Sequence, residues 1–356
     1  MLTSTLMRQN SSWRHVILCL PLVSLACSGD SPAIPDAGQT MDLAVGDQGV
    51  ADWSKESSVE GGTDSGSCNH PPLPEDCPTK SEPWSAACYD PSLPCDCPTP
   101  PNESCVDGFA DTLAPKPRWV GSIAALPASR NWAGAWVWHP GPALPSPATR
   151  YLISLHGSKS NGVSQLYWWH DRILRLRECK GVDLGLIAPL YLKPNSEPGD
   201  YLDQDEIYAV VDSVLQDEVK AGRAASSGHI FHGHSRGSAN LYSLGVLDGK
   251  DGSRWAGHYV ANSGAWRNQP PPPVFDALNK DDKTALSKTA YLIYYGLQDH
   301  DPDQNGVNAQ NRAADVVKKL GGTVKIVEEA EGCHSTFLQG ERSDHAFEAL
   351  LWALGE

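Results

Sequence analysis

The sequence is poor in basic residues. Its 356 residues include 28 Lys and Arg against 43 Asp and Glu, which gives a formal net charge of -15 at pH 7. Binding to nucleic-acid phosphates depends on clustered Lys and Arg, and the sequence contains no such cluster. The composition therefore argues against a nucleic-acid partner, and the acidity favours solubility.

A hydrophobic run long enough to cross a bilayer is missing as well. The apolar stretch at residues 16–26 is shorter than the roughly 20 residues that a spanning helix needs. It follows Arg8, Arg14 and His15, an arrangement that is typical of an export signal. We therefore predict a signal peptide over residues 1–26 and a protein that leaves the cytoplasm.

The end of this segment is similar to a bacterial lipobox. Leu25 and Ala26 precede Cys27, which would be acylated and become the mature N-terminus. Lipoboxes usually carry Leu three places before the cysteine, where this chain has Ser24, and residues 24–26 also suit an ordinary signal peptidase. We favour a lipoprotein of the bacterial cell envelope that touches the membrane only through Cys27, and simple secretion stays the alternative.

Two segments without a helix or strand pattern follow the signal. Residues 28–67 are rich in Asp, Gly and Ser, so they cannot bury enough surface to offset their ordering entropy, and we predict a disordered acidic linker. Residues 68–117 form a Pro-rich segment. In an exported protein, its closely spaced cysteines favour disulfides over a metal site. These cysteines are Cys68, Cys77, Cys88, Cys95, Cys97 and Cys105.

From Arg118 onward, apolar runs of strand length alternate with helix-patterned segments. This alternation predicts a mainly parallel sheet with helices on both faces, an α/β fold over residues 118–356. The expected strands lie at residues 132–138, 151–155, 184–191, 229–232, 258–262, 290–295 and 324–328. Helices are expected at residues 204–221, 305–320 and 343–354.

A Gly-x-Ser-x-Gly motif lies where one of these strands turns towards a helix. In such a turn the serine, here Ser235, adopts a strained backbone at the tip. Gly233 and Gly237 let the strand and the helix approach each other. The motif alone is weak evidence because it occurs by chance in many proteins. Its position between strand and helix makes Ser235 a candidate nucleophile.

Two later strand ends supply the partners that a serine nucleophile needs. A base must accept the serine proton, and a carboxylate must orient that base. Asp299 follows the strand at 290–295, and His334 follows the strand at 324–328. Because the carboxyl ends of successive parallel strands meet at one edge of a sheet, we expect Ser235, Asp299 and His334 to converge.

Some neighbouring residues compete for these roles. Asp301 and Asp303 are rivals for the acid, but Asp299 is favoured because it lies at the strand end. Residues 301–306 copy the first half of a calcium loop, whose twelfth position here is Arg312 rather than Glu, so a solvated acidic loop is favoured. Strand histidines at 229, 232 and 234 have no partner ligands at convincing spacing, so we expect no metal.

The strand at 151–155 leads into a second loop of interest. Here a backbone N–H, of Ser158 first and of Gly157 second, can pair with the N–H of Arg236. Two such donors would stabilise the oxyanion of a tetrahedral intermediate. Trp168 and Trp169 lie just beyond this loop. They either bind sugar or fill the core, and the core is favoured.

Together, these motifs resemble the α/β-hydrolase superfamily over residues 118–356. They look most like its compact carboxylic ester hydrolases, the group of feruloyl esterases, acetylxylan esterases and polyhydroxybutyrate depolymerases. The resemblance implies a serine esterase without a cofactor. It makes Ser235 the nucleophile, His334 the general base and then acid, and Asp299 the carboxylate that orients His334.

Cysteines beside the site depart from the pattern of this group. Some members join a cysteine beside the nucleophile to one beside the histidine, whereas here Cys333 precedes His334 but His234 precedes Ser235. Cys179 lies near the end of a helix that should return to the opposite edge of the sheet. We therefore do not expect a disulfide between Cys179 and Cys333.

The substrate is expected to be an extracellular ester. Fewer than thirty residues separate the strands at 258–262 and 290–295, so there is no room for a large helical lid. An open cleft suits esters carried on polymers or polysaccharides. The alternatives are a serine peptidase or acyltransferase on the same fold, because fold and triad do not fix the acyl acceptor, and a non-catalytic surface-binding protein.

Overall fold

The computed structural model describes residues 109–142, 149–158, 160–193, 200–250, 254–299, 301–339 and 344–355. The chain divides into two compact units, Met1–Cys68 and Asn69–Glu356, and all described residues belong to the second. The predicted signal peptide, Cys27, the acidic linker and the six clustered cysteines lie outside the described residues.

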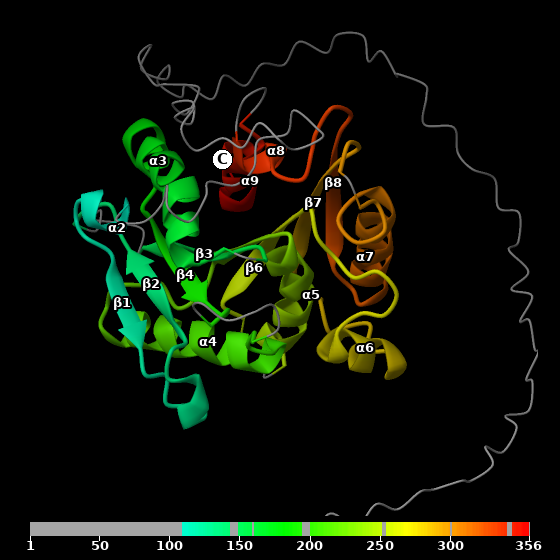
Figure 1. The fold of residues 1–356 in the computed structure, drawn as a ribbon, viewed down its shortest axis with the longest axis horizontal. Coiled ribbons are helices and arrows are strands. Elements are labelled where there is room, and N and C mark those ends of the chain that lie inside the picture. The colour runs from blue at the N-terminus through cyan, green and yellow to red at the C-terminus, as the bar shows by residue number, and fades with distance from the viewer. Residues whose placement is uncertain are drawn as a thin grey trace, which may run out of the picture. The chain divides into compact units, whose positions relative to one another are not determined.

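An eight-stranded sheet runs through the described residues (Figure 1), in the order β1-β2-β4-β3-β5-β6-β7-β8. The strand β2 pairs antiparallel with β1 and β4, and the strands from β4 to β8 are parallel. The bounds are β1 Arg118–Gly121, β2 Gly134–Trp138, β3 Arg150–Leu155, β4 Leu184–Leu190, β5 His229–His234, β6 Ala256–Asn262, β7 Ala290–Gly296 and β8 Thr323–Glu329.

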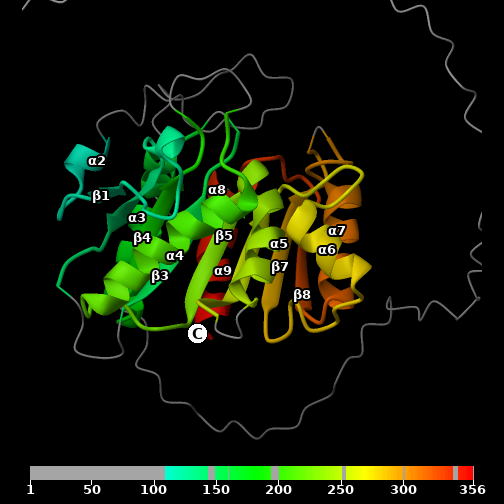
Figure 2. The same cartoon turned by 90° about the horizontal axis from the view of Figure 1, so that it is seen from below.

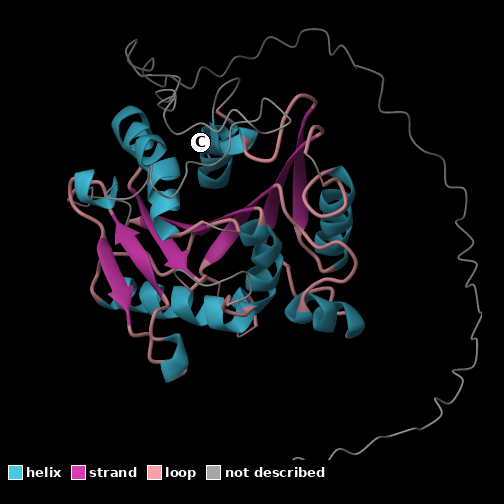
Figure 3. Ribbon diagram, in the orientation of Figure 1, coloured by secondary structure: helices cyan, strands magenta, loops and turns pink. Residues whose placement is uncertain are grey.

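Helices cover both faces of this sheet, as Figure 3 shows. The face seen in Figure 2 carries α4 (Gln204–Lys220), α5 (Arg236–Asp248), α6 (Pro272–Asn279) and α7 (Val307–Lys319). The opposite face carries α2 (Phe109–Thr112), α3 (Gly162–Lys180), α8 (Thr336–Gln339) and α9 (His345–Leu354). The predicted α/β architecture, a mainly parallel sheet between helices, is confirmed.

Two hydrophobic cores follow from the alternation of side chains along the strands. Successive strand residues point to opposite faces, so Ile153 packs under α4 and α5 while its neighbour Leu152 packs under α3 and α9. Both side chains are fully buried. The strand β1 was not predicted, because it is short and half exposed and therefore shows no clear apolar run.

The described end of the Pro-rich segment packs onto this sheet. Leu113 belongs to the core beneath α3, and the indole N–H of Trp138 donates to the carbonyl of Pro115 at 2.9 Å. Residues before β1 therefore contribute to the same domain. Among the described residues, every helix is too short or too polar to span a membrane.

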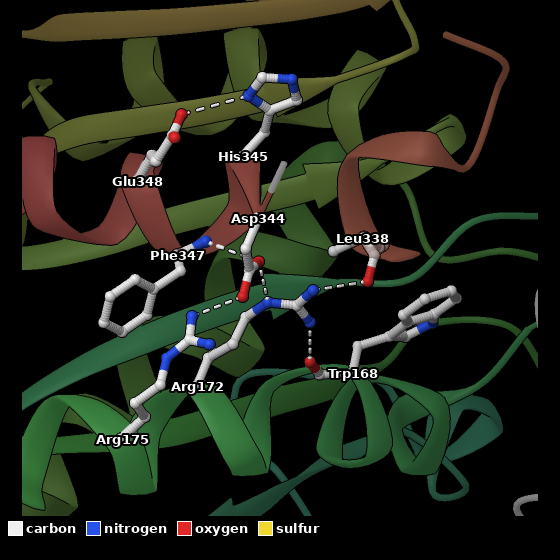
Figure 4. Close-up of polar contacts among 8 residues, drawn as sticks. All are labelled: Trp168, Arg172, Arg175, Leu338, Asp344, His345, Phe347 and Glu348. Carbon is white, nitrogen blue, oxygen red and sulfur yellow. Dashed lines mark hydrogen bonds and ion pairs between the residues drawn. The ribbon is translucent and has the colours of Figure 1, made fainter. Parts of the chain in front are cut away.

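A buried cluster of charges joins α9 to α3 (Figure 4). Asp344 caps the first turn of α9 by accepting from the N–H of Phe347 at 3.2 Å. Its two carboxylate oxygens also accept from Arg172 Nε at 2.7 Å and from Arg175 Nη2 at 2.5 Å. Burial alone would raise the pKa of Asp344, but the two guanidinium groups outweigh burial and lower this pKa below its ordinary value.

The same cluster holds the chain that follows the candidate base. Arg172 donates from Nη1 to the carbonyl of Trp168 at 2.5 Å and from Nη2 to the carbonyl of Leu338 at 2.8 Å (Figure 4). Leu338 lies in α8, only a few residues after His334. The guanidinium group therefore links α3, α8 and α9 in one hydrogen-bonded unit.

We predict that Asp344→Ala lowers the free energy of unfolding by about 3–5 kcal/mol, because it leaves two buried guanidinium groups without their carboxylate. Urea unfolding at pH 7 measures the change. The matched control is Asp315→Ala, which removes an exposed carboxylate 4.0 Å from Lys318 and should cost less than about 0.5 kcal/mol. Equal losses in the two variants would contradict a structural role of the cluster.

Candidate active site

Ser235 lies at the turn between β5 and α5. It is the N-cap residue of α5, yet its side chain makes no capping hydrogen bond. Its backbone has φ 54° and ψ -117°, a conformation that costs free energy for a residue with a Cβ. A serine at an N-cap normally accepts a hydrogen bond from the first turn, so the strained backbone releases the hydroxyl from that role.

Glycines surround this turn because backbones approach each other there. A Cβ on Gly233 would lie 2.3 Å from the carbonyl carbon of Gly237, and one on Gly237 would lie 2.4 Å from the carbonyl oxygen of Leu155. A Cβ on Gly264, which follows β6, would lie 1.8 Å from the carbonyl oxygen of Ser235. Gly264 lies in no motif of the sequence, because the residue that it approaches, Ser235, is distant along the chain.

The structure pairs Asp299 with His334. Asp299 follows β7 and is buried, and its Oδ2 lies 2.7 Å from His334 Nδ1. Nδ1–H donates to the carboxylate, which leaves Nε2 of His334 as the acceptor nitrogen. The rival Asp301 pairs instead with Arg267 at 2.9 Å, and Asp303 accepts from the side chain of Asn308. The carboxylate at the strand end is therefore the one that reaches the histidine.

The three candidate residues follow β5, β7 and β8, and β6, the strand expected at residues 258–262, lies between β5 and β7. Because these four strands run parallel, Ser235, Asp299 and His334 all follow carboxyl ends at the same side of the sheet. Within the described residues, the hydroxyl of Ser235 makes no hydrogen bond. The expected hydrogen bond between Ser235 and His334 is therefore not formed in this structure.

His234 joins the serine turn to the histidine loop. Its ring centroid lies 4.9 Å from that of His334, and its Nε2 lies 3.2 Å from the carbonyl oxygen of His334. Burial, and then the nearby His334, lower the pKa of His234 to about 3. The ring is therefore neutral at ordinary pH, and Nε2–H donates because a carbonyl oxygen only accepts.

The loop after β3 approaches Ser235 from the other side. A Cβ on Gly157 would lie 3.3 Å from the Cβ of Ser235. His156, which precedes it, is fully buried, stacks on Tyr191 at a centroid distance of 4.1 Å and accepts from the Tyr191 hydroxyl through its carbonyl. These contacts fix the start of the loop. The first N–H of α5, on Arg236, has no acceptor within the helix because it belongs to the first turn.

A cavity of about 520 Å³ opens at Ser235, Ser158 and Arg236. Its aromatic lining comes from Tyr201 and Trp266. Most of its polar lining consists of side-chain amides, from Gln204, Asn240, Gln269, Gln304 and Asn305. The sequence did not identify these residues, because nothing in it shows which amide and aromatic side chains point into a shared cavity.

Other candidate ligands serve structural roles. Trp168 and Trp169 belong to α3 and are buried in the core between α3 and the sheet, as favoured over sugar binding. His232 hydrogen-bonds to Ser154 at 2.8 Å, and His229 accepts from the N–H of Tyr151 at 3.0 Å. In the described ranges, no three His, Cys, Asp or Glu residues lie in an arrangement that could hold a metal ion.

Cys179 and Cys333 are both disulfide-bonded. Cys179 lies in the last turn of α3, next to the start of β4, whereas Cys333 follows the end of β8. Because β4 and β8 run parallel, Cys179 lies at the amino ends of the strands and Cys333 lies at their carboxyl ends. A disulfide requires Cα atoms within about 7 Å, so these two do not pair with each other.

No protein-family model and no curated relative matches this sequence. Similar solved structures include a bacterial heroin esterase, with a TM-score of 0.51 and 11% identity over 70% of this chain and 88% of that chain. Another is an esterase from Pyrobaculum calidifontis, with a TM-score of 0.48 and 11% identity over 71% of this chain and 89% of that chain. At this low identity, the similarity to the heroin esterase concerns the fold alone. With the mainly parallel eight-stranded sheet, it shows that the chain has the α/β-hydrolase fold.

Proposed function

We propose that the protein is a serine hydrolase that cleaves carboxylic esters through Ser235. The observation that carries this proposal is the pair formed by Asp299 and His334, 2.7 Å apart, on a loop that contacts His234, the chain neighbour of Ser235. Nucleophilic acyl transfer requires a serine hydroxyl together with a histidine that a carboxylate orients, and Ser235 has a strained backbone and an uncapped hydroxyl. The resemblance to compact carboxylic ester hydrolases supports esters as the substrate class.

In the acylation step, Ser235 Oγ attacks the ester carbonyl carbon while His334 Nε2 accepts the serine proton. Asp299 holds the imidazole through Nδ1 and stabilises the imidazolium that forms. The carbonyl oxygen becomes an oxyanion, which accepts from the backbone N–H groups of Arg236 and of Ser158 or Gly157. The intermediate then collapses, the C–O bond to the alcohol breaks, and His334 gives its proton to that alcohol.

Deacylation repeats these steps with water. His334 Nε2 accepts a proton from a water molecule, whose oxygen attacks the acyl carbon. The bond from this carbon to Ser235 Oγ then breaks, the acid is released, and His334 returns the proton to Ser235 Oγ. His234 acts as a positioning residue in both steps. Its Nε2–H donates to the backbone carbonyl of His334, the residue that transfers the proton. This hydrogen bond fixes the histidine loop relative to the serine turn.

Export of this enzyme completes the proposal. An N-terminal signal over residues 1–26, lipidation at Cys27 and an acidic linker over residues 28–67 would hold the domain away from a membrane surface. Disulfides in the segment at 68–117 belong to the same hypothesis, because such bonds persist in oxidising compartments. The disulfide-bonded Cys179 and Cys333 support an exported protein.

We predict that a fluorophosphonate probe labels the parent protein and that Ser235→Ala abolishes both the labelling and the turnover of short p-nitrophenyl esters. Loss of the nucleophile should reduce kcat/KM by about 10³-fold or more. Gel fluorescence and absorbance assays measure the two effects. The control is Ser287→Ala, which changes a serine in the loop before β7 and should keep both the probe labelling and the ester turnover. Absence of labelling in the parent would instead favour a non-catalytic surface-binding protein.

His234 offers a test of the positioning role. We expect His234→Leu to lower kcat by about 10- to 100-fold, since a small misplacement of a catalytic group has an effect of this size. His234→Gln retains an N–H donor and should recover most of that loss. Rescue by Gln distinguishes the hydrogen bond from packing, and thermal melting checks the fold. Equal kcat values in Leu and Gln variants would refute the role.

Lipidation is tested in a bacterial host that is fed a labelled fatty acid. We expect the label on the parent protein and not on Cys27→Ala, because acylation requires the thiol at the cleavage site. The fractionation of the two proteins is the second measurement, and the parent should be found with membranes. Equal labelling of both proteins would reject the lipobox and leave simple secretion.

A further inference from the structure

We propose that the esters cleaved by this protein carry a carboxylate group and that the side chain of Arg236 recognises it. This inference rests on the proposed ester hydrolysis and adds a substrate class. The residue that follows the nucleophile would then act twice, through its backbone N–H on the oxyanion and through its guanidinium group on the substrate.

The charge of the cavity carries this inference. Thirteen residues line the cavity at Ser235, and Arg236 is the only one of them with a charged side chain. The chain as a whole has the opposite sign, with a formal net charge of -15. A lone cation in a cavity lined by amides and aromatic rings attracts anions, and it gives no advantage to a neutral ester.

The guanidinium group of Arg236 is held in place and still has unused donors. Its central carbon lies 3.8 Å from the centroid of the Tyr201 ring, which is a cation–π contact. Within the described residues, its side chain makes no ion pair and no hydrogen bond. The stacked face leaves the edge of the group available, and that edge matches a carboxylate with two parallel N–H donors.

The charged neighbours of the cavity are already paired. Arg267 pairs with Asp301 at 2.9 Å, and Asp299 is buried against His334. Asp203 accepts from the N–H of Glu206 at the start of α4. None of these three residues lines the cavity. No carboxylate of the cavity wall therefore competes with a substrate for Arg236.

The position of Arg236 also limits where the carboxylate sits in the substrate. Ser235 and Arg236 line the same cavity of about 520 Å³. A substrate that fits this cavity should therefore carry its carboxylate a short distance from the ester carbon, in the acyl group or in the alcohol. Half-esters of short dicarboxylic acids and acyl esters of hydroxy acids both meet this condition. Amides on the wall, such as Gln204 and Asn305, suit hydroxyl groups on the same molecule.

The test compares esters that differ only in this group. Monoethyl succinate is set against ethyl succinamate for the acyl side, and acetoxyacetate against acetoxyacetamide for the alcohol side. We expect the parent to favour the carboxylate in at least one pair by about 10-fold in kcat/KM, the size of one charge-assisted hydrogen bond. The preference should shrink between 50 mM and 500 mM salt, because salt screens an exposed pair.

Substitutions assign the preference to one side chain. Arg236→Gln, which keeps the backbone N–H, should lower the ratio of carboxylate to carboxamide turnover about 10-fold, and Arg236→Lys should keep part of it. The matched control Arg267→Gln removes an arginine that is already paired and should leave the ratio unchanged. The ratio is independent of any general loss of activity, and fluorophosphonate labelling checks the nucleophile in each variant.

Two negative outcomes are distinct. A labelled parent that hydrolyses the carboxamide esters, with a ratio that is the same in Arg236→Gln, would overturn this inference and leave ester hydrolysis standing. A parent that is neither labelled nor active on any of the four esters would overturn the proposed function, and this inference with it.

Discussion

The contact between β5 and α5 is the constraint on which the candidate site depends. Gly233 and Gly237 approach so closely that a side chain on either would overlap backbone atoms. This approach makes the turn at Ser235 sharp and holds the serine at φ 54°. The strain is sustained by neighbours, because the N–H of Ser235 donates to the carbonyl of Asn262 at 2.9 Å on the adjacent strand.

A second constraint fixes the histidine loop from both of its ends. Asp299 holds the ring of His334, and His234 holds its backbone carbonyl. Further along, α8 is tied to α3 through Arg172, which Asp344 keeps in place. The loop therefore spans two anchored points, one at the sheet edge and one in a buried ion cluster.

Much of the fold could be predicted from the sequence, because long apolar runs and helical periodicity report burial directly. Asp299 could be preferred over Asp301 because the carboxyl ends of parallel strands meet at one edge. The place of β3 between β4 and β5 could not be predicted, since strand order depends on contacts between distant segments. The same reason hid Gly264, whose neighbour is the carbonyl of Ser235, and Tyr201, whose ring lies under Arg236.

Arg236 brings two sources of positive charge to the candidate site. As the first residue of α5, it presents a backbone N–H that the helix cannot use, and the helix dipole adds partial positive charge there. Its side chain leaves the helix into the cavity and stacks on Tyr201. An anionic substrate would therefore meet positive charge from both groups. In the proposed reaction the backbone N–H would stabilise the oxyanion and the side chain would bind the substrate carboxylate, so the two roles would use different groups of one residue.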